Sequence, residues 1–255
     1  MKIVYCGFGR AALEGFYLLI NSIDVEMSDI IVFTHDVEQN KEFINHLRNN
    51  NIEYYVDSIN NHDEDLLLFK PNLLLSIYYR FIIKPETLKL VNYKAMNLHP
   101  SYLPAYRGTK SSVWALLNDE KETGITFHYI TETVDGGNII LQKKLNILDT
   151  DTAYSLYNKL ISMFVQNFPE ALNRLIKDFK GEAQQGKITY YERKLPFNGE
   201  MDFDKTTYPE AKLFVRALYF PPHKGAIFGS SSHEKVEVKS LEELEKYEHL
   251  FKEKK

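Results

Sequence analysis

The sequence predicts an α/β protein with a mostly parallel central sheet, on the strength of three observations. Short continuous apolar runs recur through the first half, helix-like segments separate them, and a glycine-containing turn follows the first run. Strands of parallel sheets read as continuous apolar runs because helices cover both faces of the sheet. At 255 residues, the chain is long enough for one large domain and a small appendage.

Strand and helix patterns alternate regularly up to residue 77. Apolar runs mark the strands, and segments with one apolar face mark the helices. We expect strands at residues 2–6, 30–34, 52–56 and 73–77, and helices at residues 10–20, 41–49 and 64–70. This order is typical of a Rossmann-like fold with flanking helices.

The pattern changes beyond residue 94. We expect a short strand at residues 95–99, a loop rich in Pro and Gly at 100–108 and a helix at 110–117. Two strands that include an antiparallel member follow at 124–130 and 138–141, and then a long amphipathic helix at 151–177. Residues 181–187 are the best linker candidate, which predicts a catalytic domain at 1–180 and a small C-terminal α+β or all-β subdomain at 181–255. Within that subdomain we expect a strand at 188–191, a helix at 208–218 and a solvated helical end from Ser240.

Composition excludes several classes of protein. Lys and Arg number 31 against 35 Asp and Glu, giving a net charge of −4, so no strongly basic surface for nucleic acid is expected. The single cysteine, Cys6, cannot form an intrachain disulfide. Apolar runs fall far short of the ~20 residues that a membrane-spanning helix needs. We therefore expect a soluble, cytoplasmic protein without membrane or nucleic-acid partners.

Gly7-x-Gly9-x-x-Ala12 follows the first strand and opens the first helix. This pattern satisfies a loose dinucleotide fingerprint, in which phosphate approaches a helix N-terminus. The same glycines serve any tight strand-to-helix turn, which is the interpretation that we favour. An NAD(P)-dependent oxidoreductase remains an alternative.

Asn97-Leu98-His99-Pro100-Ser101 lies at the end of a predicted strand. Alternation along the strand places Asn97 and His99 on one side. An amide donor beside an imidazole suits a reaction that forms an oxyanion while a proton leaves the nucleophile.

Two further motifs extend this one, Leu103-Pro104-Ala105-Tyr106-Arg107-Gly108 and Asp135-Gly136-Gly137. Together the three motifs resemble those of the folate-dependent formyltransferases, which include methionyl-tRNA formyltransferase, glycinamide ribonucleotide transformylase and the sugar N-formyltransferases. The resemblance spans nearly the whole of the first 180 residues. It implies that a substrate amine attacks the formyl carbon of 10-formyltetrahydrofolate.

The resemblance also implies a role for each catalytic residue. Asn97 would donate a hydrogen bond to the oxyanion, and His99 would accept the amine proton or stabilise the oxyanion. Asp135 would bias the imidazole and organise a water that relays a proton to the leaving nitrogen. A metal site formed by His99, His128 and Asp135 matches no recognised ligand spacing, so we expect no metal.

Two loops are expected to hold the folate. By resemblance, one supplies Tyr78, Phe81, Ile82 and Ile83, and the other supplies Val134 and Asp135. Arg80 departs from the family pattern, where a smaller or more polar residue is usual, so we assign it to the acceptor. Without the resemblance, residues 78–83 would be read as ordinary core aromatics.

Size, charge and the segment 215–226, which the tRNA and sugar branches share, favour a sugar N-formyltransferase. The expected acceptor is a nucleotide-linked amino sugar such as dTDP-4-amino-4,6-dideoxyglucose, used for O-antigen and lipopolysaccharide synthesis. Methionyl-tRNA formyltransferase and a non-catalytic nucleotide-sugar binder are the alternatives, and apolar residues near the C-terminus are compatible with a homodimer. Cations that suit the pyrophosphate are Arg10, Arg80, Lys84 and Arg107, and aromatic residues that suit the base are Tyr106, Tyr219 and Phe220.

Overall fold

The computed structural model describes residues 1–252, which form two compact units. The first unit comprises residues 1–99, 125–143 and 161–187, and the second comprises residues 100–124, 144–160 and the chain from 188 onward. This division does not coincide with the boundary expected at residue 180. The reason is that two long strands and one long helix contribute residues to both units.

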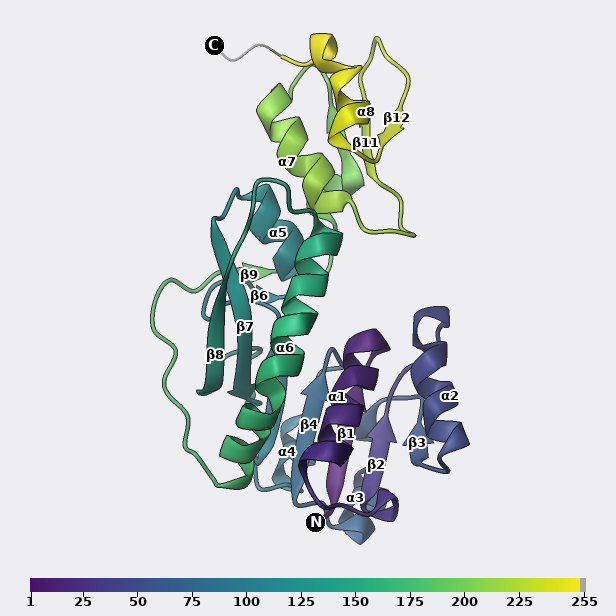
Figure 1. The fold of residues 1–255 in the computed structure, drawn as a ribbon, viewed down its shortest axis with the longest axis vertical. Helices are drawn as coiled ribbons and strands as arrows, with labels where there is room; N and C mark the ends of the chain where they lie inside the picture. The colour runs from purple at the N-terminus through teal and green to yellow at the C-terminus, as the bar shows by residue number, and fades with distance from the viewer. Residues whose placement is uncertain (253–255) are drawn as a thin grey trace. The chain divides into compact units, whose positions relative to one another are not determined.

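A seven-stranded sheet organises the fold, in the order β3-β2-β1-β4-β5-β7-β8 (Figure 1). The first five strands of this order are parallel, and β7 pairs antiparallel with β5, as the sequence predicted. Their bounds are β1 Ile3–Gly7, β2 Ile30–Phe33, β3 Glu53–Tyr55, β4 Leu73–Ile77, β5 Ala95–His99, β7 Glu122–Tyr129 and β8 Ile139–Asn146. The mixed α/β class with a mostly parallel sheet is confirmed.

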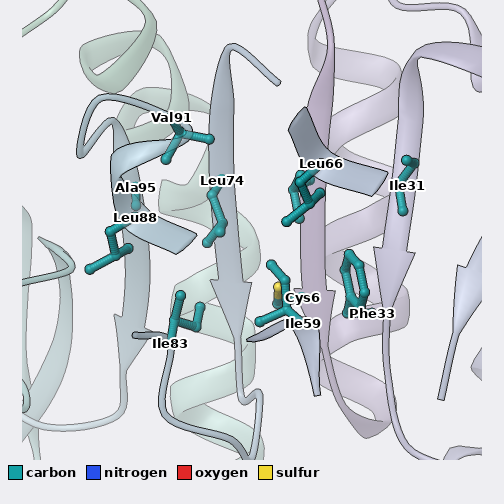
Figure 2. Close-up of a cluster of buried hydrophobic side chains, with 11 residues drawn as sticks. Cys6, Ile31, Phe33, Ile59, Leu66, Leu74, Ile83, Leu88, Val91 and Ala95 are labelled. Atoms are coloured by element: carbon teal, nitrogen blue, oxygen red, sulfur yellow. The ribbon is translucent and has the colours of Figure 1, made fainter. Parts of the chain in front are cut away.

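Helices cover both faces of the parallel strands. Alternation sends Val4 and Cys6 of β1 into one core cluster, which also contains Leu66 and Leu88. Figure 2 shows this cluster. Tyr5, between Val4 and Cys6 in sequence, points to the other face and packs against Phe16, with ring centroids 5.4 Å apart. The helices of the first face are α3 Asp63–Phe69 and α4 Pro85–Lys89, and those of the second are α1 Gly9–Ser22 and α2 Lys41–Asn49.

The second unit contains the remaining helices, small sheets and a separate apolar core. Its bounds are α5 Ser111–Leu117, β6 Arg107–Gly108, β9 Tyr190–Tyr191, β10 Glu200–Asp202, α7 Tyr208–Leu218, β11 Ala226–Gly229, β12 Val236–Val238 and α8 Leu241–Glu245, while α6 Ala153–Ile176 supplies residues to both units. The tail beyond Ser240 is only partly solvated. Leu244 is fully buried and Phe251 is 8% exposed, because both belong to the core of this unit.

The segment expected to be a linker is bonded to the first unit. Glu182 forms two backbone hydrogen bonds with Ile139, at 2.7 and 2.9 Å. Asn138 Nδ2 donates to the Lys180 carbonyl at 3.2 Å. Glycine and polar residues at 181–187 therefore mark a segment paired with the start of β8, and the linker prediction is wrong for residues 181–184.

Candidate active site

Strand β5 and the loop after β7 bring the three predicted catalytic side chains together in the first unit. Asn97 and His99 share one side of β5, and Asp135 lies in the loop that leaves β7. Asp135 Oδ2 is 3.5 Å from His99 Nδ1. The His99 and Asp135 side chains are only 5% and 10% exposed, so water screens their attraction weakly.

Asn97 is the middle member of a row of polar side chains that crosses three strands. The registers pair Ser76 of β4 with Asn97, and Asn97 with His128 of β7. The Ser76 hydroxyl donates to Asn97 Oδ1 at 2.8 Å, and Asn97 Nδ2 lies 3.1 Å from His128 Nε2. His128 Nδ1 is 2.8 Å from the Tyr129 carbonyl oxygen.

This row determines the orientation of the Asn97 amide. The Tyr129 carbonyl can only accept, so Nδ1 of His128 carries a hydrogen, and Nε2 is the ring nitrogen that faces the Asn97 amide as an acceptor. The Ser76 hydroxyl satisfies the amide oxygen. The other hydrogen of the Asn97 amide is then available to a substrate oxygen, and an oriented donor of this kind stabilises an oxyanion without reorganising.

The Asp135 carboxylate lies between two imidazoles. Its Oδ1 is 3.5 Å from His128 Nε2, while its Oδ2 faces His99 at the same distance. The two rings are 6.4 Å apart and nearly perpendicular. A negative charge in this position favours a protonated imidazole at His99, as a general base needs after it has accepted a proton.

Residues 78–83 form the loop expected to hold the folate. Phe81 and Ile82 are 42% and 72% exposed, whereas Ile83 is 6% exposed and belongs to the core. In the second predicted loop, Val134 is 39% exposed. Tyr78 has a φ of +58°, which turns the chain sharply at the end of β4. Exposed apolar side chains in both loops suit the flat faces of a ring system such as a pterin.

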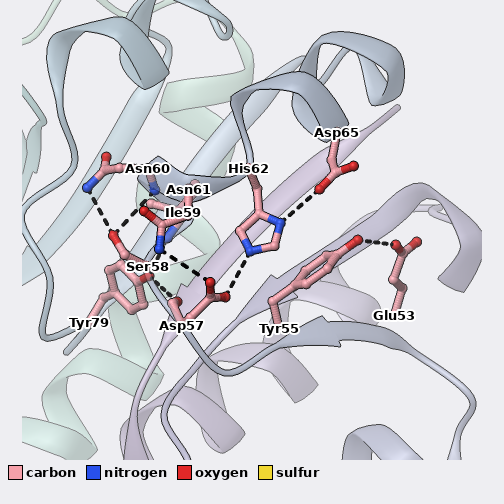
Figure 3. Close-up of polar contacts among 10 residues, drawn as sticks. All are labelled: Glu53, Tyr55, Asp57, Ser58, Ile59, Asn60, Asn61, His62, Asp65 and Tyr79. Carbon is pink, nitrogen blue, oxygen red and sulfur yellow. Dashed lines mark hydrogen bonds and ion pairs between the residues drawn. The ribbon is translucent and has the colours of Figure 1, made fainter.

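A polar network supports the first of these loops, and Figure 3 shows the part of it around Tyr79. Asn60 Nδ2 donates to the Ile82 carbonyl at 2.8 Å, and the Lys84 N–H donates to Asn60 Oδ1 at 2.9 Å. The Tyr79 hydroxyl accepts from the Ile59 N–H at 3.0 Å and donates to the Asp57 carbonyl at 3.2 Å. Burial raises the pKa of Tyr79 well above its ordinary value, so the phenol keeps the proton that it donates.

The glycine-containing turn after β1 is filled by the protein itself. The Gly9 N–H donates to Asn40 Oδ1 at 2.8 Å, and the fully buried Asn40 side chain also bonds Thr34 and the His35 carbonyl. The Phe8 N–H donates to the Ile77 carbonyl at 3.1 Å. Because these donors are already used, the turn does not present them to a pyrophosphate. This geometry contradicts the dinucleotide-binding alternative.

The cations predicted to bind the acceptor have different surroundings in the first unit. The Arg80 guanidinium lies 4.6 Å from the centre of the Phe8 ring, and its backbone N–H donates to His35 Nε2 at 3.2 Å. Arg10 Nε is 3.7 Å from Glu14 Oε1. Arg80, Arg10 and Lys84 are all exposed, as a phosphate ligand must be.

The other predicted acceptor residues belong to the second unit. Tyr106 is 8% exposed, stacks on Tyr191 with centroids 5.2 Å apart and donates to Glu120 at 2.6 Å. This packing argues against stacking of Tyr106 on a base. The Arg107 N–H pairs with the Thr189 carbonyl. Tyr219 and Phe220 are half-buried at the end of α7, and Phe220 packs edge-on against Tyr154 and Tyr157.

Within residues 1–252, no three His, Cys, Asp or Glu side chains are arranged to hold a metal ion. In that same part of the chain, no helix combines the length and apolar character needed to cross a membrane.

Sequence reasoning missed several residues that shape the site. Ser76 and Asn60 carry no recognisable motif, and His128 was considered only as a metal ligand. The alternating pattern at residues 124–130 could have revealed His128, because it puts His128 and Thr126 on one face of the strand. The partner of that strand, which decides where the face points, was not evident from the sequence.

Comparison with known proteins identifies the family to which the chain belongs. A family described as formyl transferase matches residues 29–172. The GDP-perosamine N-formyltransferase of Brucella melitensis is 36% identical over 230 residues, covering 89% of this chain and 88% of that protein. A 4-N formyltransferase from Francisella tularensis is similar in fold, with a TM-score of 0.77 and 23% identity over 93% of this chain and 96% of that chain.

A structure of the Helicobacter canadensis N-formyltransferase, in complex with folinic acid and dTDP-3-aminofucose, has a TM-score of 0.72. It is 26% identical and covers 86% of this chain and 81% of that chain. The chain therefore belongs to the formyl transferase family. Within that family it is a sugar N-formyltransferase, which confirms the predicted resemblance and the predicted enzyme class.

Proposed function

We propose that this enzyme transfers the formyl group of 10-formyltetrahydrofolate to the amine of a nucleotide-linked 4-amino-4,6-dideoxy sugar. The convergence of Asn97, His99 and Asp135 in one shielded site carries the proposal. The relatives support it, because one is named for GDP-perosamine and another was solved with folinic acid and a dTDP-linked amino sugar.

The chemistry follows from the positions of the three side chains. As the sugar nitrogen bonds to the formyl carbon, the carbonyl electron pair moves onto oxygen, where the available Asn97 N–H stabilises it. His99 accepts the proton that leaves the amine, and the Asp135 carboxylate stabilises the resulting imidazolium. The carbon–nitrogen bond to the folate then breaks, and the folate nitrogen takes up a proton delivered from this pair.

The two loops bordering the site supply what the folate requires. Phe81 and Ile82 offer apolar surface from one loop, and Val134 offers it from the other. Tyr78, Ile83 and Asp135 would contribute backbone or polar contacts at the pterin edge. A pterin placed between these loops would bring N10 of the folate, which lies outside the pterin ring and carries the formyl group, toward Asn97 and His99.

The nucleotide carrier is the finer part of the proposal. dTDP-4-amino-4,6-dideoxyglucose remains our first candidate, and GDP-perosamine, for which one relative is named, is the second. Arg10, Arg80, Lys84 and Arg107 are the cations suited to the pyrophosphate, since charge-assisted bonds to phosphate are strong. Tyr219 and Phe220 are the remaining candidates for the base. We further propose that the product enters surface polysaccharide of the O-antigen type.

A direct assay tests the proposal. Purified protein is incubated with 10-formyltetrahydrofolate and each of these two nucleotide sugars, and products are analysed by mass spectrometry. We expect one formyl group on the sugar amine and an equal amount of tetrahydrofolate. Absence of the modification on every amino sugar, together with formylation of methionyl-tRNA, would replace this proposal by the tRNA alternative.

A further inference from the structure

We propose that Gln184 is a positioning residue for formyl transfer, acting by holding Asp135 in place. This inference rests on the proposed function, because it concerns the carboxylate that faces His99. Gln184 lies in residues 180–184, the segment that pairs with the start of β8, and it takes no direct part in bond making.

The Gln184 amide bridges two carbonyls of the Asp135 loop, which comprises residues 131–137. Its Nε2 donates to the Asp135 carbonyl oxygen at 2.7 Å and to the Gly137 carbonyl oxygen at 2.9 Å. A primary amide carries two N–H groups on one nitrogen, so one side chain can satisfy both carbonyls. The bridge spans Gly136 and fixes the backbone on each side of it.

The Asp135 loop needs such support because its backbone is unusual. Asp135 has a φ of +50°, in the left-handed region that non-glycine residues adopt at a cost. At Gly136, a Cβ would lie 2.6 Å from Thr133 Cγ2, and at Gly137 it would collide with the Tyr129 carbonyl. The loop therefore turns tightly, and residues 131–134 ahead of the turn are exposed.

Gln184 is itself held firmly. Glu182 makes a two-bond antiparallel bridge with Ile139, and Gly181, at a φ of +72°, lets the chain approach Asn138 closely. Gln184 is half-buried, whereas its neighbours Ala183 and Gln185 are exposed. A side chain anchored in this way can transmit a fixed position to the carbonyls that it bonds.

Loss of the bridge would act first on the Asp135 carboxylate, whereas the first folate loop, at residues 78–83, does not depend on the bridge. Asp135 Oδ2 is 3.5 Å from His99 Nδ1, a separation at the outer edge of direct interaction, so a small displacement breaks the contact. A displacement of about 1 Å in an active site can lower a rate by roughly 100-fold. The effect should fall on kcat, because the Gln184 side chain faces the loop backbone.

Gln184→Met tests the role, since it keeps the length of the side chain and removes both donors. Gln185→Met is the matched control at the exposed neighbouring position. We expect Gln184→Met to lower kcat by roughly 10- to 100-fold, with KM for the nucleotide sugar within about threefold of the parent and an unchanged melting temperature for the control. A kcat within about twofold of the parent would overturn the inference.

A second measurement needs no substrate and so separates this inference from the proposed function. Long-range ¹H–¹⁵N spectra report the ring nitrogens of each histidine. In Gln184→Met, we expect the signals of His99 and His128 to shift, while those of His46 and His62 stay in place. Unchanged His99 and His128 signals, or equal shifts at all four rings, would refute a specific hold on Asp135 whatever the enzyme formylates.

Discussion

Ser76 and Asn97 lie opposite each other on adjacent parallel strands, and the Ser76 hydroxyl donates to the Asn97 amide oxygen at 2.8 Å. On the other side of Asn97, His128 accepts from the amide nitrogen. The Asn97 amide is thus oriented from both ends by buried neighbours in the sheet.

Ser76→Ala should therefore lower kcat without abolishing it. Loss of one buried hydrogen bond costs about 1 kcal/mol, which corresponds to about a fivefold change in rate. Steady-state kinetics with the nucleotide sugar would measure the change. Ser111, whose hydroxyl donates to the Pro100 carbonyl in the second unit, offers a buried control, and Ser111→Ala should leave kcat close to the parent value.

His99→Asn should abolish formyl transfer. Asparagine keeps a polar side chain of moderate size but cannot accept the amine proton at neutral pH. Acceptor affinity, measured by calorimetry, should stay within a few-fold of the parent because the imidazole acts on the reacting nitrogen. Turnover equal to that of the parent would remove His99 from the mechanism.

Asn60→Ala should weaken folate binding. The Asn60 side chain joins the Ile82 carbonyl, the Lys84 N–H and the Thr87 hydroxyl, so its loss frees the loop that presents Phe81 and Ile82. We expect KM for 10-formyltetrahydrofolate to rise about tenfold, equal to about 1.4 kcal/mol, with a smaller change for the sugar. Asn61→Ala is the matched control, because Asn61 makes only a 3.4 Å contact with Asp57.

His62 should make stability depend on pH. Burial lowers the pKa of His62, but hydrogen bonds to Asp65 and Asp57, each 2.8 Å long, outweigh it and raise the pKa. For Asp57 the signs are opposite. Burial raises its pKa, but hydrogen bonds from His62 and Asn61 outweigh burial, so the pKa of Asp57 is lowered. The pair thus stabilises the fold when His62 is charged and Asp57 is ionised. The contribution of His62 is complete below its unfolded pKa of about 6.5 and is lost as the pH rises through the higher folded value.

His62→Gln isolates that contribution. Its melting temperature should fall below that of the parent by more at about pH 5.5 than at about pH 9, where the parent histidine is neutral. Below about pH 4 the difference should shrink again, as Asp57 is protonated through its lowered pKa. A deficit that is equal at all three pH values would contradict the ion-pair explanation.

The parallel part of the fold was predictable because its signals are local. Residues 73–77 are apolar apart from Ser76, residues 95–99 carry three apolar side chains beside Asn97 and His99, and both segments form strands with the expected bounds. Helix α2 at residues 41–49 has three buried apolar residues on one face, and it too matches the expectation. In the second unit, β9 falls within the strand expected at 188–191. Strands β10, β11 and β12 were missed because they are only three or four residues long and depend on partners distant in sequence.

The site was predictable only as far as motifs reach. Asn97, His99 and Asp135 each belong to a short motif, so sequence reasoning could name them before their convergence was visible. Ser76, Asn60 and Gln184 act through hydrogen bonds whose partners lie more than 20 residues away along the chain. Such pairings depend on strand register and loop conformation, which neither composition nor periodicity encodes. Tyr106 shows the reverse case, since its aromatic character suggested a ligand contact and its packing made it structural.

The Asn40 side chain occupies the turn after β1 and accepts a hydrogen bond from the Gly9 N–H. In nucleotide-binding folds of this type, the turn after the first strand binds phosphate. In this chain the Asn40 side chain bonds the turn instead, and it thereby connects the β1–β2 crossover to the β2–β3 crossover. The carboxyl ends of β1 and β2 are therefore held in place. The predicted catalytic side chains lie elsewhere, on β5 and in the loop after β7. Substitution of Asn40 would therefore lower the stability of the fold rather than create a nucleotide-binding site.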